Sequence, residues 1–291
     1  MSDNAINKSS IKRNDTGLKV VIYIVSVIFA IMTLFPFVIM ITNSFRSTFE
    51  IQQSTLGMVS AHPFENLAKN WNEITNKEFH PLVGFKNSFI ISTLSTILNV
   101  YFSSLTAYAI SAYEWKLRDA FNNMIVGIMM VPGTVTTIGF VQIVYKLGLT
   151  NKLFLFIVPA IASPMTVFFM RQYLQASLSM EIVQSARIDG AGEFRIFNQI
   201  VVPLMKPAIA TQAIFGYVAS WNNLFMPLIL LTETEKKTIP VMVKLLNGDI
   251  YRREYGAIYL GLFVTVIPLI VVYAFLSRFI VEGVALGGVK S

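Results

Sequence analysis

Cysteine is absent from the 291 residues, and charged residues make up only 13% of them. Without cysteine, the chain has no disulfide bond, no thiolate metal site and no cysteine nucleophile. The charged share is about half that of a typical soluble domain, and an apolar share of 54% indicates a chain that lies in lipid. The 23 basic and 16 acidic residues are scattered, so anionic lipid headgroups fit as counter-charges better than nucleic acid.

Six long runs of the sequence contain no charged residue at all. A helix needs about 20 apolar residues to cross a bilayer, and each run is long enough or nearly so. The runs lack the alternation and the short length of barrel strands. They cover 20–45, 87–113, 120–145, 153–170, 207–232 and 255–277. The sequence therefore predicts an all-α polytopic membrane protein with six transmembrane helices.

The segment 1–18 is polar and rich in Ser and Asn, and we expect it to be a cytoplasmic tail that is either disordered or loosely attached to the membrane surface. Six crossings place both termini on one side, and four basic residues up to Lys19 favour the cytoplasm for that side. The first run is too long for the apolar core of a signal peptide, so we expect it to remain as the first span. Residues 19–291 then form a single membrane domain.

The six runs also lack histidine, so they hold no side chain suited to a proton relay. Sodium coupling needs no such residue, but it normally accompanies repeats and paired broken helices that the sequence does not display. No Lys-Ser or Lys-Thr pair follows a glycine, so the chain has no phosphate-binding loop for ATP. A membrane-embedded enzyme would need a catalytic pair, and none is present. The energy for active transport must come from another polypeptide.

Small polar residues form a stripe in the second run. They recur every three or four residues and therefore share one helix face. The stripe consists of Ser92, Thr96, Asn99, Ser103 and Thr106. Such a face can line a water-filled path, or it can serve close helix packing.

The fifth run carries aromatic and amide residues together before Pro227. Amides form hydrogen bonds with sugar hydroxyls and aromatic rings stack on sugar C–H faces, although the same aromatic residues also suit an interfacial belt. We therefore take as the candidate translocation path Tyr217, Trp221, Asn222, Asn223 and Asn99.

The segment of about 172–206 is the longest inner loop. After two candidate caps, Ser177 and Ser179, the pattern predicts a short helix from Met180 to Asp189 that Gly190 ends. A second short helix follows up to Pro203, with one face formed by Phe194, Phe197 and Ile200 or Val201. These apolar residues either fill a cleft of a partner protein or lie on the membrane surface.

Residues 184–191, Gln-Ser-Ala-Arg-Ile-Asp-Gly-Ala, resemble the EAA loop of bacterial ABC importer permeases, in which the glycine is followed ten residues later by Ile-x-Leu-Pro. Ile-Val-Val-Pro at 200–203 has that spacing. The amino-acid sequence from 186 to 197 is similar to that of the carbohydrate-uptake branch of these permeases, and within this branch to the smaller permease of maltose-type systems. Ser-Trp-Asn-Asn at 220–223, and 279–283 leading to 287–290, agree with that branch.

The resemblance implies that this loop docks on an ATPase subunit, and we call it the docking loop. The residues that it assigns to docking are Gln184, Ser185, Ala186, Arg187, Asp189, Gly190, Ile200 and Pro203.

Three positions depart from the family pattern: Gln184 replaces a glutamate, Ser185 an alanine and Val202 a leucine. A glutamine still forms hydrogen bonds, and loss of one exposed ion pair costs less than about 1 kcal/mol, so we expect docking to persist. Charged candidates for the rim of the contact are Arg187, Asp189, Glu193 and Arg195.

The resemblance also implies a function. The chain is expected to be the transmembrane permease subunit of an ATP-binding-cassette importer that translocates a sugar or oligosaccharide across the cytoplasmic membrane by alternating access. The implied partners are a second homologous permease, two ATPase subunits that bind ATP and Mg, and an extracytoplasmic solute-binding protein. This chain would hold no cofactor and no metal, and would not be an enzyme. A stand-alone ion-coupled or passive carrier, and an ABC permease for a non-sugar solute, are the alternatives.

Overall fold

The computed structural model describes residues 3–76, 79–246 and 253–287. Every regular element in these ranges is helical. The chain divides into two compact units, one of residues 1–76 and 249–264 and the other of residues 77–248 and 265–291.

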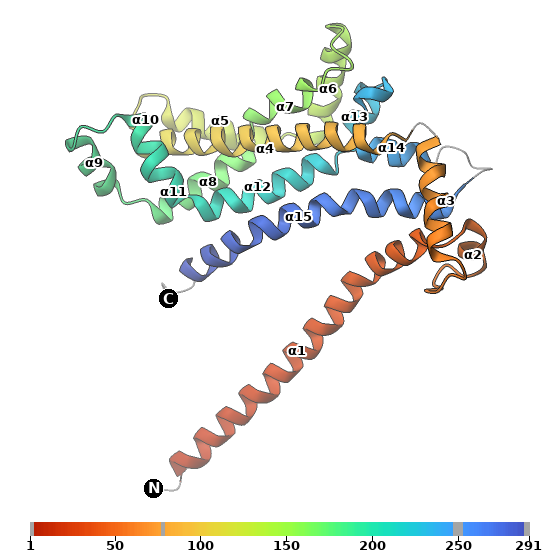
Figure 1. Cartoon of the computed structure of the whole chain (residues 1–291). Helices are drawn as coiled ribbons and strands as arrows, with labels where there is room; N and C mark the ends of the chain where they lie inside the picture. Colours follow the sequence, from red (N-terminus) through yellow and green to blue (C-terminus); the bar gives the residue numbers. More distant parts are fainter. Residues whose placement is uncertain (1–2, 77–78, 247–252, 288–291) are drawn as a thin grey trace. The chain divides into compact units, whose positions relative to one another are not determined.

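The first unit contains α1 (Asp3–Ser44), α2 (Thr48–Gln53), α3 (Pro63–Asn76) and the beginning of α15 (Tyr255–Gly287) (Figure 1). Helix α1 begins at Asp3, within the segment expected to be a tail. Of the two alternatives for this segment, disorder was wrong, because the helix of the first span continues without interruption into the polar residues before it.

The connection between α1 and α3 folds around a buried arginine. The Arg46 side chain is 4% exposed, and its guanidinium donates to the carbonyl oxygens of Glu50, Ser54 and Gly57 at 2.6–2.8 Å. It also donates to Asn43 Oδ1 at 2.8 Å. The arginine thereby gives the Gly57 carbonyl a donor and adds a second donor to the carbonyls of Glu50 and Ser54, which also accept from backbone N–H groups.

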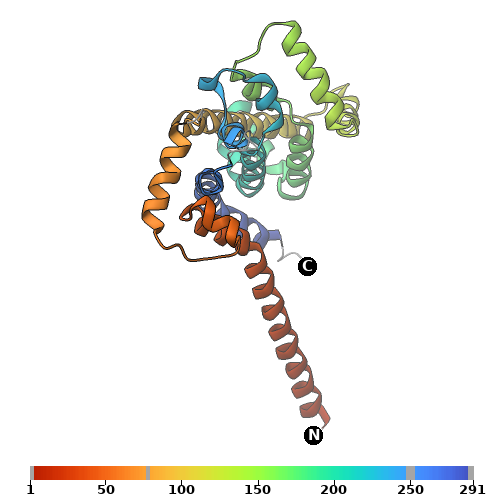
Figure 2. The ribbon, with the colours of Figure 1, turned by 90° about the vertical axis from the view of Figure 1, so that its right-hand side faces the viewer.

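The second unit contains the remaining helices. In chain order these are α4 (Pro81–Ala112), α5 (Arg118–Met129), α6 (Gly133–Lys146), α7 (Phe154–Ile157), η1 (Val158–Ile161), α8 (Pro164–Ser177), α9 (Met180–Ile188), α10 (Glu193–Ile196), the π-helical turn η2 (Phe197–Val201), α11 (Val202–Leu204), α12 (Lys206–Trp221), α13 (Phe225–Leu230), η3 (Thr234–Lys236), α14 (Ile239–Leu246) and the rest of α15. The 32-residue α4 lies at its centre, packed along α8 and α12 (Figure 1, Figure 2).

Four helical segments are long and apolar enough to cross a membrane: Gly17–Ser44, Pro81–Ala112, Phe154–Ser177 and Tyr255–Phe275. Two bent pairs of helices also qualify when each pair is taken together. They are Arg118–Met129 with Gly133–Lys146, bent by 94°, and Glu193–Leu204 with Lys206–Trp221, bent by 79°. The described residues thus hold four to six candidate spans, which confirms the all-α polytopic fold.

Two of the expected spans are broken helices. The run 120–145 divides at Val131–Pro132, because Pro132 has no N–H group to continue α5 and α6 begins only at Gly133. The run 207–232 divides after Trp221, and α13 begins at Phe225. Uncharged length located both runs. The Pro132-Gly133 pair by itself predicts an interruption at the first break, whereas no proline lies at the break after Trp221.

Candidate functional site

The docking loop begins with the short helix that the sequence predicted. Helix α9 covers Met180–Ile188, and Gly190 has a φ of +79°. The N–H of Gly190 donates to the carbonyl of Arg187, and the N–H of Ala191 to that of Ala186, both at 3.0 Å. This pair of bonds is a Schellman motif, which requires the left-handed conformation that glycine adopts easily. The predicted helix end at Gly190 is confirmed.

An ion pair closes the turn after α9. Arg187 Nε donates to Glu193 Oε1 at 2.6 Å, and Arg187 Nη2 donates to Oε2 at 3.3 Å. Tyr113 and Tyr108, at the end of α4, donate their hydroxyls to Oε2 as well, Tyr108 at 3.3 Å. Hydrogen bonds from Arg187 and then from Tyr113 hold the pKa of the Glu193 carboxyl below its ordinary value of 4.5. Glu193 therefore links both parts of the docking loop to α4.

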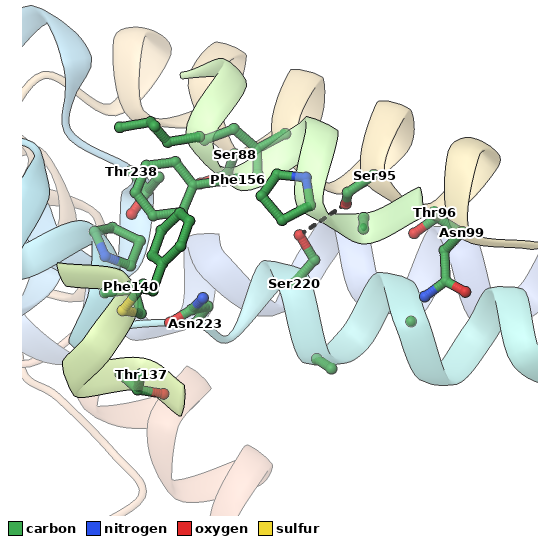
Figure 3. Close-up of a pocket in the computed structure, with 18 of the residues that line it drawn as sticks. Ser88, Ser95, Thr96, Asn99, Thr137, Phe140, Phe156, Ser220, Asn223 and Thr238 are labelled. Carbon is green, nitrogen blue, oxygen red and sulfur yellow. Dashed lines mark hydrogen bonds between the residues drawn. The ribbon is translucent and has the colours of Figure 1, made fainter. Parts of the chain in front are cut away.

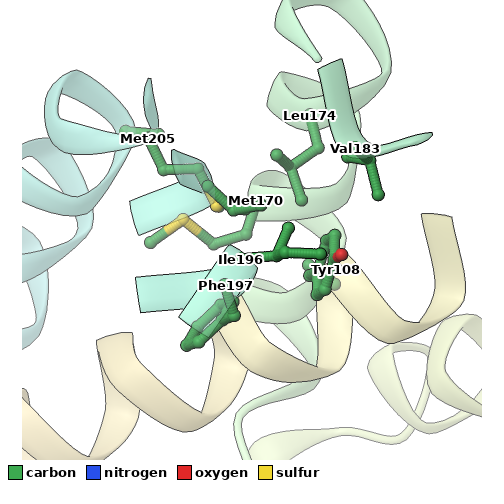
Figure 4. Packing of buried hydrophobic residues seen from close by; sticks show 10 residues of the cluster. Tyr108, Met170, Leu174, Val183, Ile196, Phe197 and Met205 are labelled. Carbon is green, nitrogen blue, oxygen red and sulfur yellow. The ribbon is translucent and has the colours of Figure 1, made fainter. Parts of the chain in front are cut away.

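Buried apolar side chains attach the docking loop to the body of the second unit. Val183 of α9, Ile196 of α10 and Phe197 are almost completely buried. They pack in one cluster with Tyr108 of α4 and Met170 of α8 (Figure 4). The loop is thus folded onto the ends of two long helices, so a displacement of the loop must also displace those helices.

The outward face of the docking loop combines polar and apolar side chains. Ile188 is 86% exposed and Phe194 is 68% exposed. Among the predicted docking residues, Gln184, Ser185, Asp189, Gly190 and Pro203 are exposed, and Ala186, Arg187 and Ile200 are half-buried. These two apolar side chains are therefore available to a partner protein or to the membrane surface, the two alternatives that the sequence left open.

Two local expectations for the loop were wrong. Phe194 does not share the buried face of Phe197 and Val201, since Phe194 is 68% exposed and the other two are buried. Ser179 occupies the N-cap position of α9, but its side chain makes no capping hydrogen bond. The hydroxyl of Ser177 donates back to the carbonyl of Tyr173 instead.

A polar cavity of about 610 Å³ lies within the second unit. Its walls come from α4, α6, α7, η1, α12 and α13 and the residues that join them (Figure 3). The residues that line it are Ser88, Ile91, Ser95, Thr96, Asn99, Thr136, Thr137, Phe140, Leu155, Phe156, Pro159, Ala160, Ala162, Gly216, Ala219, Ser220, Asn223, Met226, Pro227 and Thr238. None of these described lining residues is charged.

Several polar groups in this lining have no partner within the part of the chain that the structure describes. Thr96 Oγ1 and Thr238 Oγ1 are buried without a hydrogen bond. The Asn99 carbonyl accepts from Ser103 at 3.3 Å, and Ser95 donates to Ser220 at 3.2 Å. Buried hydroxyls without partners are costly, so these two threonine hydroxyls are unsatisfied hydrogen-bonding groups in the wall of the cavity.

The structure brings two of the five predicted path residues, Asn99 and Asn223, to the polar cavity. Tyr217 and Trp221 are buried outside its lining, where their rings stack at 5.8 Å and the Trp221 indole N–H donates to the carbonyl of Thr265 at 3.0 Å. Asn222 is exposed and also lies outside the lining.

The stripe on α4 is divided between a cavity wall and helix packing. Thr96 and Asn99 line the polar cavity, whereas Ser92 and Ser103 are fully buried in helix packing. Sequence reasoning missed Phe140, Phe156 and Thr238 as lining residues. They lie on separate elements that meet only through the helix breaks, and no periodicity within one run could have found them.

Comparison with known proteins identifies a family. Residues 99–285 match the model of the family described as "Binding-protein-dependent transport system inner membrane component". The match includes the docking loop and most of the cavity lining. In the C-terminal sequence that resembles the carbohydrate-uptake branch, residues 279–283 fall within α15, and residues 288–290 lie outside the described residues.

Two relatives and one solved structure resemble the chain over most of its length. The arabinooligosaccharides transport system permease protein AraQ of Halalkalibacterium halodurans is 33% identical over 90% of this chain and 92% of its own. The lactose transport system permease protein LacG of Rhizobium radiobacter is 31% identical over 93% and 96%. The crystal structure of a bacterial ABC transporter for import of the acidic polysaccharide alginate covers 91% of this chain and 97% of its matched chain, with a TM-score of 0.78 and 22% identity.

Proposed function

Because the chain belongs to the family of binding-protein-dependent transport system inner membrane components, we infer that it is the permease subunit of an ABC importer that carries a sugar or oligosaccharide. It is a transporter subunit rather than an enzyme, and a separate ATPase supplies the energy. The observation that carries this proposal is the docking loop, whose exposed Ile188 and Phe194 project from a segment anchored to α4 and α8.

The full assembly in this proposal contains four further partners. A second homologous permease completes the membrane part, two ATPase subunits bind to the cytoplasmic side, and an extracytoplasmic solute-binding protein delivers the cargo. ATP and Mg bind to the ATPase subunits, and this chain holds no cofactor. Both termini lie in the cytoplasm, the docking loop faces the ATPases, and the assembly lies in the bacterial cytoplasmic membrane.

The docking loop acts as a lever between ATP hydrolysis and transport. When the two ATPase subunits close, they move the α9 helix that is seated on them. Val183, Ile196 and Phe197 transmit this movement, because their contacts with α4 and α8 are too densely packed to deform independently. The ends of these helices rock, and the polar cavity opens alternately to the two sides of the membrane.

The polar cavity supplies this chain's contribution to the cargo path. Its amides and hydroxyls, Asn99, Asn223 and Thr238 among them, match sugar hydroxyls, and the rings of Phe140 and Phe156 offer apolar faces for sugar C–H groups. Its uncharged lining favours a neutral sugar, since a uronic acid would leave a carboxylate without a counter-charge.

The docking role is tested by placing a charge on the exposed apolar face. We expect Phe194→Asp to lower retention of the ATPase during purification of the co-expressed assembly by about 30-fold, because a buried interface aromatic contributes about 2 kcal/mol or more. Val59→Asp is the matched control, since Val59 is 86% exposed on a different segment. If the Phe194→Asp assembly retains as much ATPase as the control, the docking proposal fails.

The cargo role is tested at two adjacent asparagines. Asn223 lines the polar cavity and Asn222 does not. We expect Asn223→Ala to slow uptake of the sugar into proteoliposomes by about tenfold, which corresponds to one or two lost hydrogen bonds, while ATPase retention stays unchanged. Asn222→Ala should transport at the native rate. Equal rates for the two variants would exclude the polar cavity from the path.

A further inference from the structure

A second cavity of the same unit, of about 370 Å³, shares no lining residue with the polar cavity. Its walls come from the last turn of α4, the start of α5, the last two turns of α8 and the connection to α9. We call it the arginine cavity because Arg118 and Arg171 both line it. The proposed function gives this cavity no role.

The two guanidinium groups bring two positive charges to the arginine cavity, and only that of Arg118 has a counter-charge among the described residues. Arg171 forms no hydrogen bond or ion pair with any described residue. Arg118 pairs only with the neighbouring Asp119, through Nε at 3.4 Å, and that carboxylate is 89% exposed to solvent. No acidic residue is among the described residues of the lining. Two cations that face one cavity repel each other unless an anion lies between them.

Unpartnered polar atoms occur in the same lining. Arg171 Nε and Ser111 Oγ are both buried, and neither has a hydrogen-bond partner among the described residues. A buried N–H of a charged group without an acceptor is among the most costly unsatisfied groups in a protein. These two donors therefore need a hydrogen-bond acceptor, and the described residues do not provide one.

We propose that the arginine cavity binds a phosphate group, with Arg118 and Arg171 as its two cationic ligands. The planar guanidinium matches two phosphate oxygens at once, and Ser111 offers a hydroxyl donor beside it. The candidate spans of α4 and α8 end at Ala112 and Ser177, so the cavity lies at the level where a bilayer presents its headgroups.

The phosphodiester of an anionic lipid such as phosphatidylglycerol is the expected source of this phosphate, because apolar residues such as Leu174 complete the lining. Inorganic phosphate would use the same donors. Met180, the first residue of α9, also lines the cavity, so a bound phosphate holds the connection from α8 to the docking loop. The binding site does not depend on which solute the chain carries.

The test uses the complete purified assembly, with phosphatidylglycerol titrated into detergent and bound lipid counted by native mass spectrometry. We expect the affinity of one site for phosphatidylglycerol to fall about tenfold in Arg171→Gln and in Arg118→Gln, because each change removes a charge-assisted hydrogen bond. Lys116→Gln is the matched control, since it removes the same charge two residues before Arg118 but outside the lining. If Arg171→Gln does not fold, Arg118→Gln carries the test, because its side chain is 34% exposed.

A second arm measures retention of radioactive inorganic phosphate by the assembly in nanodiscs of uncharged lipid. Lipid binding that depends on the two arginines supports the proposal with a headgroup as the source. Phosphate retention that depends on the same two arginines supports it with free phosphate as the source. If Arg171→Gln and Arg118→Gln both bind the lipid and the phosphate as the native assembly and the Lys116→Gln control do, the arginine cavity is not a phosphate site.

Discussion

Gly190 is the position at which one added methyl group tests how the docking loop is built. Its φ of +79° lies in the left-handed region, and a Cβ atom built on it meets no heavy atom within 4 Å. The change Gly190→Ala therefore introduces no clash, and its whole cost is the backbone conformation, about 1–2 kcal/mol. That cost lowers the population of the closed Schellman turn, relative to open forms, by about 5–30-fold.

Hydrogen exchange measures this change directly. The Ala191 amide, which donates to the carbonyl of Ala186, should lose protection by the same factor in Gly190→Ala. Gly192→Ala is the matched control, because Gly192 has a φ of −68° and equally open surroundings. Gly190→Asn should fall between them, since asparagine tolerates the left-handed region. Equal protection in Gly190→Ala and Gly192→Ala would refute this account of the turn.

Three further predictions concern other parts of the chain. Arg46→Ala should cost the first unit about 3 kcal/mol or more, because it removes the four hydrogen bonds of a buried guanidinium and takes the donor from the Gly57 carbonyl. Limited proteolysis of 43–62 would reveal the loosened segment. Asn151→Ala should lower the melting temperature in detergent, because it removes the acceptor of the N–H groups of Thr232 and Glu233 at a cost of about 1–2 kcal/mol. Asn151→Asp keeps an acceptor oxygen and should keep most of the native melting temperature. The pKa of the Glu193 carboxyl is lowered in the folded state, so its carboxylate stabilises the loop above pH 4.5. The difference in melting temperature between the native chain and Glu193→Gln should therefore be constant above that pH and shrink as the pH falls further.

The sequence predicted the membrane spans because uncharged length is a local property. Each run contains its own evidence, and the four long candidate spans overlap the runs expected for them. The break at Pro132 follows from the proline itself, whereas the break after Trp221 depends on which backbone groups neighbouring helices can satisfy, which no single run reveals. The helical start at Asp3 was missed because a polar composition was taken as evidence against structure.

Within the candidate site, the sequence predicted a feature correctly where a single residue type is required for the backbone conformation. Gly190 ends α9 as expected because a Schellman turn needs φ above zero. The ion pair of Arg187 with Glu193 could not be foreseen, since its geometry depends on Tyr108 and Tyr113 at the far end of α4. The burial of Trp221 against the carbonyl of Thr265 likewise joins residues 44 positions apart.

The central claim is that this chain imports a sugar only as part of an ATP-driven assembly. The most direct test is uptake of radiolabelled oligosaccharides by proteoliposomes that contain either this chain alone or this chain with its neighbouring permease, candidate ATPase and solute-binding protein. The account predicts uptake only by the full assembly, only with ATP and Mg, and loss of uptake with Phe194→Asp in the docking loop. Sugar uptake by the chain alone, without ATP, would contradict it and identify a stand-alone carrier.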